Sequence, residues 1–170
     1  MIGLESGVVK LAAYSAEWKR VFELERASLQ AAVGSYALDI QHVGSTSIPG
    51  MLAKPIIDIA IAVNDFDEAR VCIRPVEGLG YEYRGEFGIP RRHYFAKGDP
   101  RIFHLHVVEI NSLEWQILLL FRDYLCQHPD VAIEYAELKA QLASRYPNDR
   151  MAYLDGKAAF IERVLQMASS

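Results

Sequence analysis

The chain is poor in several features that would mark a specialised class of protein. It has two cysteines in 170 residues, Cys72 and Cys126, and they form no paired motif. This excludes a disulfide framework or a zinc knuckle, and we expect both thiols to be buried among apolar side chains. The longest apolar runs fall well short of the ~20 residues that a membrane helix needs. The N-terminus also lacks the basic start and apolar core of a secretory signal, so we expect a cytoplasmic protein without a membrane partner.

An excess of positive charge is also missing. The 22 acidic and 18 basic residues are well mixed and give a formal charge of −4. This argues against non-specific binding to nucleic acid. The length fits one domain over residues 1–170, and nothing in the composition indicates an oligomeric state.

Apolar periodicity predicts an α+β protein with a helical C-terminal third. Short strands are expected at residues 8–12, 37–43, 55–63 and 81–85, followed by a hairpin over residues 91–110. Helices are expected at residues 15–32 and 65–78, then from Asn111, with Glu114 completing a capping box, to Cys126, and finally at residues 129–146 and 149–168. The segment ending at Cys126 is very apolar, which predicts that it is buried.

The stretch "HVGSTSIPGMLAKPIIDIAIAV" is rich in glycine and hydroxyl side chains before a β-branched strand. It does not match a Walker loop, because Lys54 does not directly follow Gly50. A Gly-Ser turn that enters a helical turn can still bind phosphate through backbone N–H groups and hydroxyls. This makes Gly44, Ser45, Thr46 and Ser47, together with Lys54, candidate phosphate ligands.

Asp58 is the one carboxylate inside the apolar strand that follows. Alternation places Asp58 and Ala60 on one face of this strand and Ile57 and Ile59 on the other. An ionised carboxylate in such a place needs a cation or hydrogen bonds. Two interpretations stay open: Asp58 caps a turn or pairs with an arginine, or it binds a divalent metal ion.

His104 and His106 share a strand face in "RIFHLHVVEI". Two imidazoles at positions i and i+2 can bind metal, contact phosphate or transfer protons, although single core histidines are common. If this strand neighbours the Asp58 strand, the three side chains form one catalytic or metal-binding cluster. Glu109 has the opposite parity, so it joins them only through a bulge.

Other basic side chains are candidates for anion binding. Arg91 and Arg92 follow a glycine-proline turn, where they are either solvated or a clamp for phosphate or carboxylate. Lys157 shares a helical face with Arg150 and Tyr153, where its ammonium group either reaches solvent or points into a site.

Several long strings resemble the GrpB family of the nucleotidyltransferase superfamily along nearly the whole chain. These strings are "HVGSTSIPGMLAKPIIDI", "GYEYRGEFGIPRRHYFAKG", "HLHVVE", "LLFRDYLCQHPDVAIEYAELK" and "RMAYLDGKAAFIERVL". The resemblance implies a nucleotidyltransferase-like fold, with a mixed sheet and a helical remainder. It also implies that Gly44 and Ser45 receive a nucleoside triphosphate, and that Asp58 is the first carboxylate of a metal-binding D-x-D or D-x-E pair.

The sequence departs from the superfamily pattern at Ala60, which stands where the second carboxylate is expected. Asp58 with His104 and His106 would make a weaker centre for Mg, Mn or Zn, with a preference for a transition metal. Three hypotheses follow: a nucleotidyltransferase that uses a nucleoside triphosphate, an inactive module that binds a nucleotide or another anion, and a metal-dependent hydrolase that uses Asp58 and the histidine pair.

Overall fold

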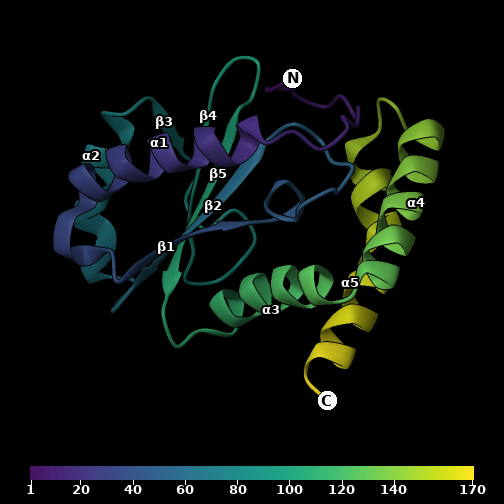
Figure 1. The fold of residues 1–170 in the computed structure, drawn as a ribbon. Helices are drawn as coiled ribbons and strands as arrows, with labels where there is room; N and C mark the ends of the chain where they lie inside the picture. The colour runs from purple at the N-terminus through teal and green to yellow at the C-terminus, as the bar shows by residue number, and fades with distance from the viewer.

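A computed structural model describes all 170 residues as a mixed five-stranded sheet with helices on both faces (Figure 1). The sheet order is β1-β2-β5-β4-β3; β2 and β5 pair in parallel, and the other neighbours are antiparallel. The strands are β1 (Asp39–Val43), β2 (Ile57–Val63), β3 (Tyr81–Tyr83), β4 (His93–Lys97) and β5 (Phe103–Glu109). The helices are α1 (Glu17–Val33), α2 (Ile73–Glu77), α3 (Leu113–Gln127), α4 (Pro129–Arg145) and α5 (Arg150–Ala168). The predicted α+β architecture is confirmed.

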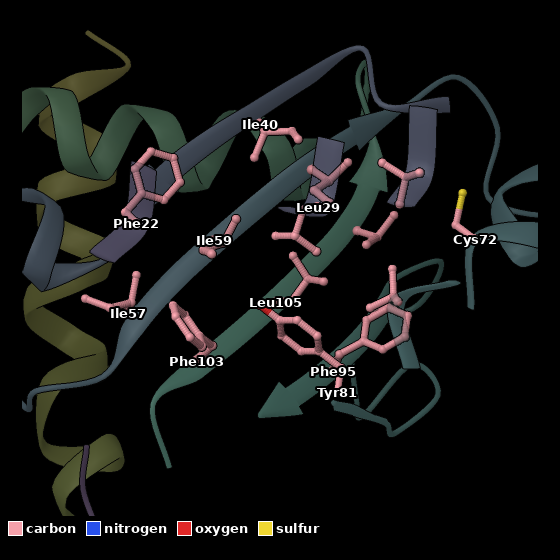
Figure 2. Close-up of a cluster of buried hydrophobic side chains, with 14 of the residues drawn as sticks. Phe22, Leu29, Ile40, Ile57, Ile59, Cys72, Tyr81, Phe95, Phe103 and Leu105 are labelled. Carbon is pink, nitrogen blue, oxygen red and sulfur yellow. The ribbon is translucent and has the colours of Figure 1, made fainter. Parts of the chain in front are cut away.

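The main core lies between α1 and one face of the sheet. Ile57, Ile59 and Ile61 of β2 point into it and pack with Leu29 of α1 and Leu105 of β5 (Figure 2). Alternation along β2 turns Ala60 and Ala62 to the opposite face, where they pack against Trp115 of α3. Figure 1 shows α1 and α3 on opposite sides of the sheet. Small alanines on this second face let α3 approach the sheet closely.

The C-terminal helices pack on one another and on the loop before β2. Ile48 and Met51 of that loop share a core with Leu125 of α3, Tyr135 of α4 and Val164 of α5. This contact fixes α4 and α5 beside the loop that carries Ser45 and Lys54. None of the helices combines the length and apolarity required to cross a bilayer.

Local details differ from the sequence predictions where tertiary packing outweighs local pattern. Residues 8–12 form no strand and contribute one isolated bridge, Ala12 to Ala53. The segment 65–78 is a 3-10 turn followed by the short α2 rather than one helix. Ser112, and not Asn111, caps α3 by accepting a hydrogen bond from the Trp115 N–H at 3.2 Å.

The predicted burial was also wrong in places. Cys72 is buried as expected, but Cys126 is exposed. Of the apolar α3, only Trp115 and Leu125 are fully buried. The helix packs on the second face of the sheet and against α4 and α5, and it leaves side chains such as Leu113, at its first residue, in solvent.

Candidate functional site

A cavity of about 260 Å³ lies where α4 and α5 meet the second face of the sheet. Its wall combines side chains from the sheet, from the C-terminal helices and from connecting segments. The strands contribute Asp58, Tyr94, His104 and His106; α4 and α5 contribute Lys139, Arg150, Tyr153 and Lys157; and the connecting segments contribute Ser45, Thr46, Lys54, Phe87 and Arg92.

Strand register explains why the sheet residues meet. In the parallel β2–β5 pair Asp58 stands opposite His104, and Ala60 stands opposite His106. In the antiparallel β4–β5 pair Tyr94 stands opposite His106. All of these positions share one parity, so their side chains leave the sheet on the same face. The condition set by the sequence, that the histidine strand neighbours the Asp58 strand, is therefore met.

Asp58 lies between the two imidazoles. Its Oδ1 is 3.4 Å from His104 Nδ1 and 3.4 Å from His106 Nε2, and 29% of its side chain is exposed. Burial alone would raise the pKa of Asp58, but the hydrogen bonds from His104 and His106 outweigh it and hold this pKa well below its ordinary value. Asp58 is therefore ionised across the physiological range.

The proton on His106 can be assigned from its second partner. Arg92 Nη1 lies 3.2 Å from His106 Nδ1, and a guanidinium group can only donate. Nδ1 therefore accepts, and the ring proton sits on Nε2, facing Asp58. Both nitrogens of His106 are engaged by protein groups.

The Gly44 turn fits closely against Asp58. Gly44 has φ of +72°, and a Cβ atom there would lie 2.7 Å from Asp58 Oδ2. Only glycine combines this backbone conformation with this approach. The next residues, Ser45 and Thr46, line the cavity. Ser47 does not, because its N–H and its hydroxyl both donate to the Gly44 carbonyl.

Thr46 is held by His42 from β1. The His42 Nε2 atom lies 2.9 Å from Thr46 Oγ1, and the ring stacks on Phe22 with centroids 4.8 Å apart. Burial lowers the pKa of His42 to about 4; the nearby Asp58 opposes this shift and Arg122 adds to it. His42 is therefore neutral at pH 7 and acts as a fixed support for the turn.

Lys54 and Lys157 approach each other across the Tyr153 ring. Their ammonium nitrogens lie 5.3 Å and 4.6 Å from the ring centroid. Burial, followed by repulsion from Lys54, lowers the pKa of Lys157 to about 8. Burial and repulsion from Arg150 lower the pKa of Lys54 in the same way. Because neighbouring positive charges repel one another here, an anion that enters the cavity would relieve the repulsion.

Lys139 is the most buried basic residue, with 1% of its surface exposed. Its amine donates to the Leu52 carbonyl and lies 4.5 Å from the centroid of Tyr135. Burial is the main cause that lowers the pKa of Lys139 to about 6, with repulsion from Lys157 and Lys54 adding to it. The sequence contains a signal for the burial of Lys139, because this lysine follows Tyr135 by four residues and so lies on the apolar stripe of α4.

The two adjacent arginines have different surroundings. Arg92 is buried and lines the cavity, where its guanidinium lies 4.6 Å from the centroid of Tyr94. Arg91 lies outside the cavity and donates to Glu109 from Nε at 3.0 Å and from Nη2 at 3.1 Å. The β2–β5 register is continuous through Glu109, so no bulge turns this carboxylate toward Asp58. The position of Arg91 does not suit the predicted phosphate clamp.

The arrangement does not fit a metal ion. No group of three histidine, cysteine, aspartate or glutamate side chains has the geometry that would hold one. Asp58 is the only carboxylate in the cavity wall, and His106 has no free lone pair. The five basic side chains around the cavity would also repel a cation. The predicted Asp58–His104–His106 centre is thus a hydrogen-bonded cluster in this structure.

Most predicted site residues meet in one place. The cavity wall includes Ser45, Thr46, Lys54, Asp58, Arg92, His104, His106 and Lys157, whereas Gly44 lies behind Asp58, and Ser47 and Arg91 lie outside. Sequence analysis missed Phe87, Tyr94 and Lys139 as site residues. It noted Arg150 and Tyr153 only through their shared helical face with Lys157.

Comparison with known proteins identifies relatives. The GrpB protein family profile matches residues 8–167. Glutamate-rich protein GrpB of Alkalihalophilus pseudofirmus is 37% identical over 171 residues, which cover 97% of this chain and 98% of that protein. UPF0157 protein YqkA of Bacillus subtilis is 40% identical over 155 residues, or 91% of this chain, but the match spans only 45% of the Bacillus protein.

Solved structures extend the comparison to the fold. The crystal structure of conserved protein GrpB from Enterococcus faecalis superposes with a TM-score of 0.88 at 35% identity, covering 94% of this chain and 96% of that one. Terminal uridylyl transferase 4 from Trypanosoma brucei with bound CTP gives a TM-score of 0.50 at 13% identity, covering 88% of this chain and 50% of that one. At that identity the likeness concerns the fold alone, and it confirms the nucleotidyltransferase-like architecture.

Proposed function

We propose that this chain, which belongs to the GrpB family, binds a nucleoside triphosphate or a related phosphate-bearing small molecule in the cavity. The observation that carries the proposal is the charge of the cavity wall. Five basic side chains (Lys54, Arg92, Lys139, Arg150 and Lys157) surround the space, and Asp58 is the only acid among the lining residues. This surplus stands out in a chain whose formal charge is −4.

Charge balance favours a polyanion over a single carboxylate or phosphate. Burial and neighbouring basic groups lower the pKa values of all three lysines, so protonating them in the free protein costs free energy. A triphosphate carries enough negative charge to compensate several of these lysines at once. Hydrogen bonds between ammonium or guanidinium groups and phosphate oxygens are also stronger than hydrogen bonds between neutral groups. The hydroxyls of Ser45 and Thr46 supply further polar contacts at the same wall.

Titration calorimetry with ATP, GTP, CTP, UTP and inorganic tripolyphosphate tests this proposal. One ligand per chain is expected, and binding should persist in EDTA, because lysine and arginine side chains rather than metal ions neutralise the phosphates. Lys157→Met should weaken binding by about 10- to 100-fold, the worth of one charge-assisted contact. Lys10→Met is the matched control, because Lys10 is exposed and does not line the cavity.

Two outcomes would contradict phosphate binding. One is the absence of heat and of thermal stabilisation with every ligand in the set. The other is an affinity that Lys157→Met and Lys10→Met leave equally unchanged. Retention of the native melting transition in each variant separates a lost contact from a lost fold.

Transfer of a nucleotidyl group to an acceptor is a second candidate. It is favoured by the nucleotidyltransferase-like fold and by the position of Asp58, which is the second residue of the strand after the Gly44–Ser45 turn and is held ionised. An ionised Asp58 beside the phosphates is placed to accept a hydrogen bond from an acceptor hydroxyl and to orient it. Without a second carboxylate at Ala60, the residues present do not support the usual pair of metal ions.

Nucleoside triphosphate consumption, measured against a panel of acceptors, tests the transfer reaction. The reactions are run in EDTA and with Mg²⁺, Mn²⁺ or Zn²⁺. Asp58→Asn keeps the shape of the side chain and removes its charge, so it should abolish turnover. An unchanged rate in Asp58→Asn would exclude the catalytic role, and binding without turnover under all conditions would leave a nucleotide-binding module.

A further inference from the structure

Two uncharged aromatic side chains, Phe87 and Tyr94, border the cavity that the five basic side chains line, which is called the basic cavity below. Phe87 lies in the loop between β3 and β4, and Tyr94 lies on β4. Their rings are nearly parallel, with an interplanar angle of 7° and centroids 4.9 Å apart. Tyr94 is buried, whereas Phe87 is 51% exposed, and both line the cavity. Tyr94 covers one face of the Phe87 ring and the Arg84 guanidinium lies 5.7 Å from the ring centroid, yet about half of Phe87 remains exposed.

The loop fixes Phe87 in an uncommon conformation. Phe87 has φ of +50°, in the left-handed region that bulky residues avoid. The buried Arg92 holds it there by donating to the Phe87 carbonyl at 3.0 Å and to the Glu86 carbonyl at 3.3 Å. Such conformations persist where surrounding contacts determine them, and they concentrate at binding sites. Here the result is a large apolar ring presented to solvent at the edge of a charged cavity.

A smaller hollow of about 70 Å³ adjoins the cavity at this ring. Phe87 and Tyr94 belong to the walls of both spaces, as do Lys54 and Arg150. The far side of the hollow is formed by residues 4–8 near the N-terminus and by Arg84, whose guanidinium lies 5.7 Å from the Phe87 ring centroid. The aromatic pair thus stands between the basic cavity and a second, smaller space.

We propose that Phe87, backed by Tyr94, is the stacking surface for the nucleobase of a nucleoside phosphate whose phosphates enter the basic cavity. This inference rests on the proposed phosphate binding and narrows its ligand to nucleotides, as opposed to polyphosphates without an aromatic group. Aromatic side chains bind bases through the π-face that every base has, so this surface should accept purines and pyrimidines with limited discrimination.

The experiment compares ATP with inorganic tripolyphosphate by calorimetry in EDTA. The variants are Phe87→Leu, which keeps an apolar side chain but removes the ring, and Phe87→Tyr, which keeps the ring. Phe87→Leu should weaken ATP binding by about tenfold and leave tripolyphosphate within about twofold, while Phe87→Tyr should retain wild-type affinity for both. Equal melting temperatures of the variants establish that the loop substitution leaves the fold intact.

The two ligands separate failure of this inference from failure of phosphate binding. If both ligands bind and Phe87→Leu weakens neither, the stacking surface is wrong and the basic cavity stands. If Phe87→Leu weakens the binding of both ligands equally, the ring stabilises the cavity and does not stack on the base, and the inference is also overturned. If neither ligand binds the wild-type protein, the proposed function itself fails and takes this inference with it.

Discussion

Lys139→Met should stabilise the ligand-free protein while weakening phosphate binding. Lys139 is 1% exposed, and burial is the main cause that lowers its pKa from 10.5 to about 6. At pH 7 the unfolded chain carries this proton and the folded chain has largely released it. Folding therefore costs about 5 kcal/mol at this residue, at 1.36 kcal/mol per pH unit between 7 and 10.5.

The substitution also removes a favourable contact. The Lys139 amine donates to the Leu52 carbonyl, and leaving a buried carbonyl unpaired costs about 1–3 kcal/mol. Methionine keeps most of the apolar stem, so packing changes little. The net gain at pH 7 is therefore about 2–4 kcal/mol, and each kcal/mol raises the melting temperature of a chain of this size by roughly 2–4 °C.

The pH dependence gives the prediction its sharpest test. A lowered lysine pKa destabilises the folded state fully below the folded pKa of about 6, and the penalty fades as pH rises toward the unfolded value of 10.5. Urea unfolding of the wild type and Lys139→Met at pH 6, 7, 8.5 and 10 should show a stability gain for Lys139→Met that shrinks across the series and reverses sign by pH 10, where the remaining penalty of about 1 kcal/mol no longer exceeds the lost hydrogen bond. Lys10→Met, at an exposed site, should show no such trend. A variant that is less stable at pH 7, or a difference that is constant with pH, would refute the reasoning.

Three further predictions follow from the same geometry. ATP affinity, measured by calorimetry, should fall as pH rises through about 8, because Lys157 loses its proton there in the free protein. In Lys157→Met this decrease in affinity should be absent. Gly44→Ala should lower the free energy of unfolding in urea by about 1–3 kcal/mol, because φ there is +72° and the new Cβ would meet Asp58 at 2.7 Å. Arg91→Ala should leave ATP affinity unchanged, whereas Arg92→Ala should weaken it, because only Arg92 lines the cavity; equal effects would contradict this assignment.

The sequence could predict on which face of its strand each site residue lies. The period of two along "IDIAIAV" and "FHLHVVE" assigns Asp58, His104 and His106 to definite faces without any knowledge of the fold. It also assigned Glu109 to the opposite face, where the structure has it bound to Arg91. The parallel pairing of β2 with β5 is a long-range choice, so sequence could state it only as a condition.

The basic wall of the cavity could not be assembled in the same way. Lys139 and Lys157 come from different helices, and their distance from Lys54 depends on how α4 and α5 pack on the loop before β2. The neighbours Arg91 and Arg92 have the same local sequence signal. They separate because Arg91 adopts φ of +60° and pairs with Glu109, while Arg92 turns inward to the loop carbonyls.

The sequence by itself determined the α+β architecture, the family, the faces of the two central strands and the absence of a carboxylate at position 60. These follow from local periodicity and residue identity, which act over a few residues. Only the tertiary structure decided that five basic side chains share one cavity, that His106 is engaged by Asp58 and Arg92, and that Phe87 is exposed at the edge of this cavity. These depend on packing between segments up to about a hundred residues apart, where small shifts in helix position decide which charges meet.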